Sequence, residues 1–474
     1  MNADVIVIGS GPNGLAAAIT VARAGHRVVV YEAEDTVGGG ARSAALTLPG
    51  FVHDICSSVH PMAATSIFMN SIPQFDGGAI WIHPKFALAH PFDDGTAILL
   101  HRGLDESCSQ FGSDARAVHT LLAPFVEKWG ELSQDILAPF HFPQNPVLLA
   151  RFGSHAIQPA ANLAVREFKS EKARAVFAGM AAHSTMRLTL PGSSAIGIVL
   201  WALCHSVGWP VARGGSQTIS NTLADHLKTL GGEILTGTRV ESLNALPKSA
   251  LVLCDLTPRQ FLRIAGERLS AKRRRRFENY RYGPGVFKVD WSLDAPIPWN
   301  AEGCNQAGTV HLGCSLEEIV ESEEAASATE PAEKPFLLVT QPSLFDPTRA
   351  PRGKHTAWAY CHVPHGCTKN VVARIEMQIE RFAKGFRSRI IGRAIMGPAD
   401  MEHHNANLVG GDIFGGEMNL KRLLLGATRS AYVTPIDGVF LCSSSTPPGP
   451  GVHGLCGYFA GQLANKRLAR TRSR

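Results

Sequence analysis

The stretch Val5-Ile6-Val7-Ile8-Gly9-Ser10-Gly11-Pro12-Asn13-Gly14 joins an apolar run to a glycine-rich turn. Four consecutive apolar residues are typical of a strand that is buried on both faces of a parallel sheet. The turn leads into Leu15-Ala16-Ala17-Ala18, which favours a helix, and a second apolar run, residues 28–31, ends at Glu32. This order of strand, glycine turn, helix, strand and acid predicts a dinucleotide-binding βαβ unit.

The glycines of the turn have separate physical roles. Gly9 allows the tight turn, Gly11 lets the backbone approach a pyrophosphate, and Gly14 lets the helix pack closely against the strand. We expect the turn, including Pro12-Asn13, to bind phosphates at the helix N-terminus. Glu32, about 20 residues further on, can accept hydrogen bonds from both ribose hydroxyls, whereas an NADP site would favour a cation there.

The next glycine run separates flavin proteins from plain NAD domains. Residues 38–43 read Gly38-Gly39-Gly40-Ala41-Arg42-Ser43. With Glu32 before it, this segment resembles the extended fingerprint of FAD enzymes of the amine oxidase and phytoene desaturase superfamily. The resemblance implies that FAD is the cofactor, that the glycines pass close to its phosphates and that Arg42 helps to hold them. The contacts implied for this part are Glu32, Ala33, Gly39, Gly40, Ala41 and Arg42.

A second strong signature lies near the end of the chain. Residues 437–442 predict a turn and strand, residues 443–454 form a glycine- and proline-rich loop, and residues 455–468 predict a helix. A helix N-terminus after such a loop can stabilise negative charge on a reduced flavin. The arrangement resembles the C-terminal FAD motif of phytoene desaturase-related proteins, in which glycine is frequent at the position of Ser443. The FAD contacts that it implies are Ser443, Ser444, Gly451, Val452 and His453.

A middle block continues the same order. A glycine loop at residues 209–217 precedes a predicted helix over residues 218–230 and two short predicted strands, residues 233–235 and 238–240. The resemblance implies that Val240 contacts the adenine end of FAD through its backbone. Residues 251–255 predict a further buried strand of the nucleotide-binding domain.

The resemblance therefore covers essentially the whole chain, and it is strongest to phytoene dehydrogenase-related proteins of the pyridine nucleotide-disulphide oxidoreductase domain type. It implies an α/β fold of two domains, with a discontinuous Rossmann-like FAD-binding domain, a mixed-sheet substrate domain and a helical insertion. The periodicity from about residue 105 to residue 186 predicts those helices. The predicted FAD-binding parts are residues 1–60, 206–265 and 426–474, and the predicted substrate-domain parts are residues 61–205 and 266–425.

Composition limits the classes of protein to consider. The 474 residues are 45% hydrophobic and 18% charged, as expected of a globular enzyme with a large core. The formal charge of +6 is modest, and no aromatic-interleaved basic face predicts nucleic acid binding. No charged, apolar leader precedes the first strand, and the apolar run at residues 195–204 is too short to span a bilayer. We expect a cytoplasmic protein.

The ten cysteines include no C-x-x-C pair, so the redox chemistry of disulfide reductases is not predicted. The cluster Cys361-His362…His365…Cys367 matches no standard zinc spacing and is expected at a strand end and turn; no metal site is predicted. The basic runs at residues 272–276 and 466–474 read as solvated surface, with peripheral contact to an anionic membrane as the alternative. The glutamate-rich segment 317–333 is expected to be an exposed, mobile loop.

Three residues are candidates for proton chemistry. Lys288 lies inside a predicted strand, residues 283–291, and in flavin amine oxidases a strand lysine of this kind holds a water beside flavin N5. It is either such a residue or a lysine that points to solvent. His60 and His453 are the histidine candidates, each with a structural role as the alternative.

The predicted activity is hydride transfer between a hydrophobic substrate, such as an isoprenoid or other polyene, and flavin N5. The alternatives are a flavin amine oxidase that produces peroxide through Lys288, and a non-catalytic protein in which FAD is structural. No second dinucleotide fingerprint predicts a separate tight NAD(P)H site. The sequence gives no prediction of the oligomeric state.

Overall fold

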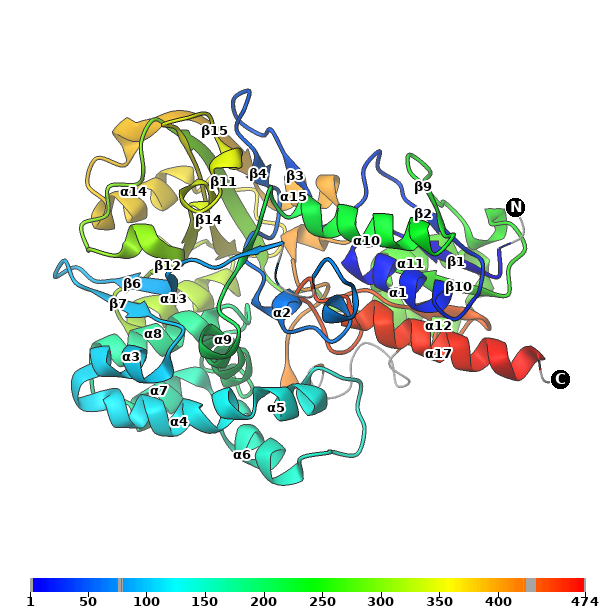
Figure 1. The fold of residues 1–474 in the computed structure, drawn as a ribbon, viewed down its shortest axis with the longest axis horizontal. Coiled ribbons are helices and arrows are strands. Elements are labelled where there is room, and N and C mark those ends of the chain that lie inside the picture. The colour runs from blue at the N-terminus through cyan, green and yellow to red at the C-terminus, as the bar shows by residue number, and fades with distance from the viewer. Residues whose placement is uncertain (1–2, 76–77, 79, 421, 423–431, 473–474) are drawn as a thin grey trace.

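A computed structural model describes residues 3–75, 78, 80–420, 422 and 432–472. Two large sheets organise the chain, and helices cover both (Figure 1). Both chain ends lie on the same side of the molecule, beside the smaller sheet (Figure 1).

The smaller sheet has five strands in the order β16-β10-β1-β2-β9, and all their pairings are parallel. Its strands are β1 (Val5–Ile8), β2 (Val28–Tyr31), β9 (Glu233–Leu235), β10 (Leu251–Cys254) and β16 (Val439–Leu441). They come from segments more than 400 residues apart, and four of them are short, apolar and almost wholly buried, whereas the edge strand β9 is partly exposed.

Alternate residues of β1 face opposite layers of helices. Val5 and Val7 pack with α1 (Pro12–Ala22), α10 (Gln217–Thr229) and α17 (Leu455–Arg472). Ile6 and Ile8 pack on the other face with α11 (Pro258–Ala265) and α12 (Ala271–Glu278). The predicted βαβ unit is therefore present with helices on both sides of the sheet.

The larger sheet has seven strands in the order β15-β11-β14-β13-β12-β6-β7. Its strands are β6 (Phe86–Pro91), β7 (Ala97–Leu100), β11 (Gly285–Leu293), β12 (Ala307–Leu312), β13 (Leu337–Thr340), β14 (His355–Val363) and β15 (Ile390–Met396). Only the β6–β12 pairing is parallel, so the sheet is mixed as predicted. Helix α14 (Val372–Phe382) packs into one core on this sheet.

The predicted helical insertion forms the lower left of Figure 1. Its helices are α3 (Leu104–Cys108), α4 (Ala115–Glu127), α5 (Trp129–Ile136), α6 (Pro146–Ala156), α7 (Ala160–Glu167), α8 (Glu171–Ala182) and α9 (Ser194–Ser206). They share one apolar core with the face of the larger sheet opposite α14. Short elements link the parts: β3 (Ser43–Ala44) with β4 (His53–Asp54), β5 (Trp81–Ile82) with β8 (Val211–Ala212), α2 (Pro61–Ala64) and α15 (Pro398–His404).

Two local expectations are wrong. The glutamate-rich segment is not a mobile loop, because α13 (Leu316–Ala326) is a helix whose Glu323 side chain is buried against His362. Residues 238–240 form no strand, because the Thr238 N–H bonds the Glu32 carbonyl outside the ladder of the sheet. Within the described residues, no helix combines the length and apolar character that crossing a bilayer requires.

Candidate active site

A cleft opens at the carboxyl ends of the parallel strands, where open α/β sheets bind their ligands. Gly9 follows β1, Glu32 follows β2, Asp255 follows β10, and Ser443 lies shortly after β16. The cleft encloses about 240 Å³ and is lined by all four of these residues.

The glycines at and beside the cleft are packed too tightly for side chains. A Cβ at Gly14 would lie 2.0 Å from the Gly9 carbonyl oxygen, so α1 lies directly against the turn after β1. Gly9 has φ +96°, which L side chains rarely adopt. A Cβ at Gly39 would lie 3.1 Å from the Gly11 Cα, so the two predicted phosphate-binding segments face each other at close range.

Two buried carboxyl groups stand at the inner end of the cleft. Glu32 accepts hydrogen bonds from Ser10, through the backbone N–H at 2.8 Å and the hydroxyl at 2.6 Å. Asp255 accepts the Gly14 N–H at 3.0 Å, at the N-terminus of α1. Burial, helped by the Glu32 charge and opposed by the Gly14 N–H, raises the pKa of Asp255 to about 7. Asp255 was not among the predicted site residues. Its position directly after a buried strand could have indicated that it lies at the ligand-binding edge of the sheet.

Cationic side chains complete the cleft. Arg42 is buried, and its guanidinium donates to the carbonyls of Gly39 at 3.1 Å and His404 at 3.0 Å. Arg239 and Arg263 also line the cleft. Glycine backbones, a helix N-terminus and arginines suit a pyrophosphate, and Glu32 suits a ribose, so the residues present fit a dinucleotide such as FAD.

The C-terminal loop closes the other end of the cleft. Gly451 has φ +145°, and Val452 has φ +57°, which is a strained conformation for a β-branched residue. Strain of this kind is typical of functional sites, where the surrounding structure holds the residue in place. The Ser443 hydroxyl donates to the Leu256 carbonyl at 2.8 Å, which anchors the loop to the segment after β10.

Most residues predicted to bind the cofactor line this one cleft. They are Gly9, Gly11, Pro12, Asn13, Glu32, Ala33, Gly39, Gly40, Arg42, Val240, Ser443, Ser444, Gly451 and Val452. Gly14, Ala41 and His453 are buried beside the cleft and are not among its lining residues.

A second cavity of about 230 Å³ adjoins the cleft and has mainly apolar walls. Ile413, Gly451 and Val452 line both spaces. The other walls come from the segment around α2, from α9, from α15 and from the larger sheet, with side chains that include Met62, Leu200, Val286, Leu338, Trp358, Tyr360 and Met401. No aspartate or glutamate is among the described residues that line this cavity.

Lys288 is the one cation in this wall among the described lining residues. Its side chain is almost wholly buried, and its ammonium group donates to the Asp54 carbonyl at 3.0 Å and to the Asp290 carboxylate. The Trp358 ring centroid lies 5.4 Å from Nζ. Lys288 therefore does not point to bulk solvent, and its charge is compensated by Asp290.

A buried polar chain continues behind Lys288. Asp290 Oδ1 lies 3.4 Å from His53 Nδ1, and the other nitrogen of His53 lies 2.7 Å from the Thr47 hydroxyl. Asp290 and His53 were missed by sequence reasoning. Asp290 was visible only as the second residue after Lys288, on the same face of the strand.

The two predicted histidines lie elsewhere. His60 is buried with Nε2 2.9 Å from the Ser216 hydroxyl, and burial lowers its pKa to about 4. His453 accepts the Leu455 N–H at 3.0 Å and so caps the start of α17; burial lowers its pKa to about 4 as well. Neither lines the cavity, and of the three proton-transfer candidates only Lys288 does.

A different histidine reaches the cavity wall. His183 lines the cavity, and its Nε2 lies 2.9 Å from Nε2 of His311. Burial lowers the pKa of His183 to about 3, so this pair is neutral at physiological pH. The histidines of the Cys361–Cys367 segment bond different partners: His362 bonds Glu323, and His365 bonds the Gly283 carbonyl.

Comparisons with known proteins agree with this architecture. Residues 7–69 match the NAD(P)-binding Rossmann-like domain family. The chain is 26% identical to pyridine nucleotide-disulfide oxidoreductase domain-containing protein 2 of Mus musculus, over 98% of this chain and 94% of that protein. By sequence it is similar to phytoene desaturases as well. The neurosporene-forming phytoene desaturase of Rhodobacter capsulatus is 24% identical over 98% of this chain and 93% of that enzyme.

Solved structures show the same fold. An oxidoreductase from Methanosarcina mazei aligns with a TM-score of 0.65 at 14% identity, over 98% of this chain and 99% of that one. Putrescine oxidase with bound putrescine aligns with a TM-score of 0.62 at 16% identity, over 99% of both chains. The family resemblance and fold class predicted from the sequence are thus confirmed, and these relatives and neighbours are oxidoreductases.

Proposed function

We propose that the protein is an FAD-dependent oxidoreductase that dehydrogenates a hydrophobic, isoprenoid- or polyene-like substrate. The observation that carries the proposal is the shared wall: Ile413, Gly451 and Val452 line both the dinucleotide cleft and the apolar cavity. A substrate in the cavity would therefore lie next to the cofactor end of the cleft. FAD, when bound, would supply the acceptor for the hydride, which carries both electrons, and the second hydrogen would leave as a proton, for which the Lys288–Asp290 pair is the candidate acceptor.

The chain's own residues bind, orient and exclude water. Met62, Leu200 and Leu338 offer an apolar surface, which favours a hydrocarbon over a hydrated substrate. Trp358 and Tyr360 are stacked side chains in the same wall, with ring centroids 5.5 Å apart, and can align an extended π-system. Since Lys288 is neutralised by Asp290, the wall presents no net charge to an uncharged polyene.

An amine oxidase is the second candidate, because Lys288 lies in the cavity wall as that activity would require. The lack of an acidic lining residue among those described favours a neutral substrate over a protonated amine. The two candidates therefore differ in the substrate that reduces the flavin.

An anaerobic absorbance titration of the FAD-loaded protein tests the proposal. Bleaching of the flavin band by a lipidic polyene is the expected result. Bleaching by amines alone, with peroxide formed when air is readmitted, would replace the proposal by the amine oxidase. Failure to bind FAD after reconstitution would overturn both.

A further inference from the structure

The loop between α5 and α6 exposes large aromatic side chains. Phe140 and Phe142 are 89% and 90% exposed, and Val147 at the start of α6 is 83% exposed. Ile67, on the segment after α2, is 55% exposed. A monomeric protein gains nothing by holding two phenylalanines in water, so a concentration of such residues marks an interaction surface.

The loop that carries these side chains is held in place. Asp135, whose side chain is 1% exposed, accepts the backbone N–H groups of Gln144 at 2.8 Å and Asn145 at 2.9 Å. The same carboxylate lies 3.1 Å from His141 Nε2. One buried carboxylate thus fixes the two ends of the segment that contains Phe140 and Phe142, and their exposure is part of the fold.

A groove of about 520 Å³ lies beside the loop. Its walls include Thr65, Ile67, Leu137, Phe140, Leu455 and Phe459. It approaches the apolar cavity through α2: Pro61 and Met62 line the cavity, and Thr65, one residue beyond α2, lines the groove. The Trp129 indole donates to the Thr65 hydroxyl at 2.6 Å, which joins α5 to the α2 segment that separates the groove from the cavity.

Basic side chains continue the same face along α17. Leu455, Phe459 and Gln462 line the groove, and Lys466 and Arg470 follow at helical spacing on the same row. Both basic residues are exposed. The helical rise places Arg470 about 16 Å beyond Phe459. Protruding aromatics beside a basic row match the interfacial region of an anionic bilayer, where apolar side chains enter the acyl boundary and cations meet headgroups.

We propose that this face docks on an anionic phospholipid bilayer, with Phe140 and Phe142 inserted and with the groove as the route by which a lipidic substrate reaches the cavity. The substrate route rests on the proposed function; the docking does not. A second copy of the chain fits the face less well, because a symmetric contact over the whole face would place both Lys466–Arg470 rows in one interface, where their like charges repel.

Sedimentation of the full chain with phosphatidylcholine vesicles, with and without phosphatidylglycerol, tests the docking. We expect Phe140→Ser/Phe142→Ser to weaken binding to both kinds of vesicle by roughly tenfold or more. Lys466→Ser/Arg470→Ser is expected to weaken binding by about tenfold on the anionic vesicles only. The matched control is Ile391→Ser/Ile395→Ser, which removes exposed apolar side chains from β15, at the opposite end of the molecule in Figure 1.

Three results would overturn the docking: a wild-type chain that binds neither vesicle, a phenylalanine variant that binds as well as wild type, or a control variant that loses as much. Analytical ultracentrifugation tests the alternative, in which a second copy of the chain binds this face. If the wild type is a dimer that the phenylalanine variant dissociates, the face belongs to a second copy and the bilayer is excluded. None of these measurements depends on flavin reduction. Failure of the docking can therefore be distinguished from failure of the proposed function.

Discussion

The Asp255 carboxyl group lies at the N-terminus of α1, where the pyrophosphate of the proposed FAD would bind. Its pKa is raised to about 7, far above the usual value for aspartate, by burial and by the Glu32 charge. A raised pKa means that the folded protein favours the protonated form, so the associated stability is present at low pH and is lost as pH rises through about 7.

The first prediction is that FAD affinity falls as pH rises from 6 to about 8, by roughly tenfold, because ionised Asp255 repels the pyrophosphate. Asp255→Asn keeps an acceptor for the Gly14 N–H and removes the charge, so its FAD affinity should be nearly independent of pH. Fluorescence titration of apoprotein with FAD across this range measures both. An equal pH dependence in wild type and variant would contradict the role of Asp255.

The second prediction concerns Lys288. Lys288→Met should slow flavin reduction by about 10²-fold or more if the ammonium takes part in proton transfer. The same change leaves the Asp290 carboxylate buried without its cation and should cost about 3–5 kcal/mol of unfolding free energy.

A second substitution separates these two effects. Adding Asp290→Asn should restore most of the stability but none of the rate, as stopped-flow reduction and chemical denaturation would show. If the double variant regains the wild-type rate, Lys288 is structural and takes no part in proton transfer.

The positions of residues were predictable where a motif fixes the spacing and much less so elsewhere. Gly9, Gly11 and Glu32 lie within one βαβ unit, so local order alone places them in the cleft. The contact between His53 and Asp290 spans 237 positions and depends on how β4 meets β11, which no local pattern encodes.

At the scale of elements, the tightest helix contact is between α1 and α17. A Cβ at Gly457 would lie 1.7 Å from the Asn13 carbonyl oxygen, so the helices meet backbone to backbone. The two helices lie side by side in Figure 1. The sequence predicted both helices but not their contact, since a glycine within a helix has many possible reasons.

The third prediction is that Gly457→Ala forces α17 away from α1 and destabilises the protein by about 1–3 kcal/mol or more, as overpacking does. Gly153→Ala in α6 is the matched control, because a Cβ there meets nothing within 4 Å. That control should be neutral or up to about 1 kcal/mol more stable, since alanine is the better helix former. Thermal unfolding of both variants measures the difference, and equal melting temperatures would refute the close packing.

Helix α13 shows why one element was mispredicted. A run of glutamates predicts solvated chain, but Ser315 accepts the Glu318 N–H and caps the helix, and His362 pairs with Glu323. The apolar residues Leu316 and Ile319 lie one turn apart and pack into the helical core, a short stripe that the charge run obscured.

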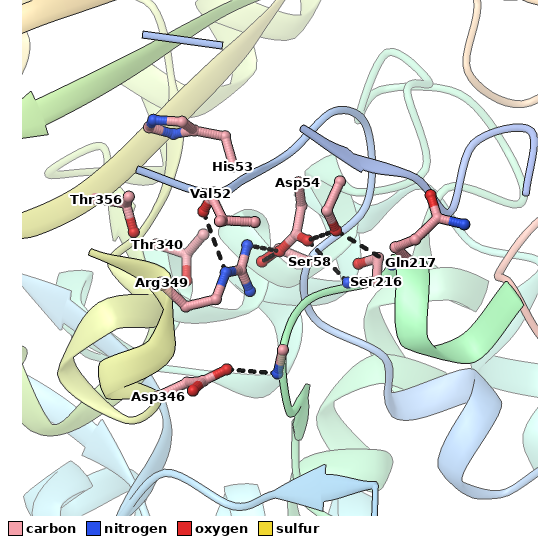
Figure 2. Close-up of polar contacts among 12 residues, drawn as sticks. Val52, His53, Asp54, Ser58, Ser216, Gln217, Thr340, Asp346, Arg349 and Thr356 are labelled. Carbon is pink, nitrogen blue, oxygen red and sulfur yellow. Dashed lines mark hydrogen bonds and ion pairs between the residues drawn. The ribbon is translucent and has the colours of Figure 1, made fainter. Parts of the chain in front are cut away.

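At the scale of the whole molecule, one buried ion pair joins the segment between β13 and β14 to strand β4, which precedes α2. Arg349 Nη2 lies 2.9 Å from Asp54 Oδ2, both side chains are 1% exposed, and Arg349 Nε donates to the Val52 carbonyl at 3.1 Å (Figure 2). Asp54 also accepts the Ser58 hydroxyl and the Ser216 N–H, at the start of α10 (Figure 2). Burial opposes ionisation, but the Arg349 charge and these hydrogen bonds hold the pKa of Asp54 below its usual value.

The fourth prediction follows from the sign of that shift. A lowered pKa gives stability that is present above the ordinary aspartate pKa, near 4, and is lost as pH falls through the folded-state value. Arg349→Met should cost about 3–5 kcal/mol at neutral pH by leaving Asp54 uncompensated. Urea denaturation at several pH values checks this, and the penalty should shrink in acid, where Asp54 becomes protonated. A penalty that stays constant with pH would assign the loss to packing alone.

The overall architecture was predictable because three sequence signatures occur in a fixed order. The runs near residues 5, 28, 233, 251 and 439 were recognisable as strands of one domain, and the structure gives their order as β16-β10-β1-β2-β9. The long-range contacts that join β4 to the β13–β14 connection were not predictable, because they depend on single buried side chains such as Arg349 that resemble surface residues in sequence.

The discontinuous small sheet also has a consequence for synthesis on the ribosome. Strand β1 pairs on one side with β2, which follows it closely, and on the other with β10, about 240 residues later in the chain. At roughly 5–20 residues per second, translation leaves that edge of β1 without its native partner for about 12–50 s. The nascent N-terminal unit is therefore a natural client for chaperones, and slow codons before β10 would lengthen its exposure.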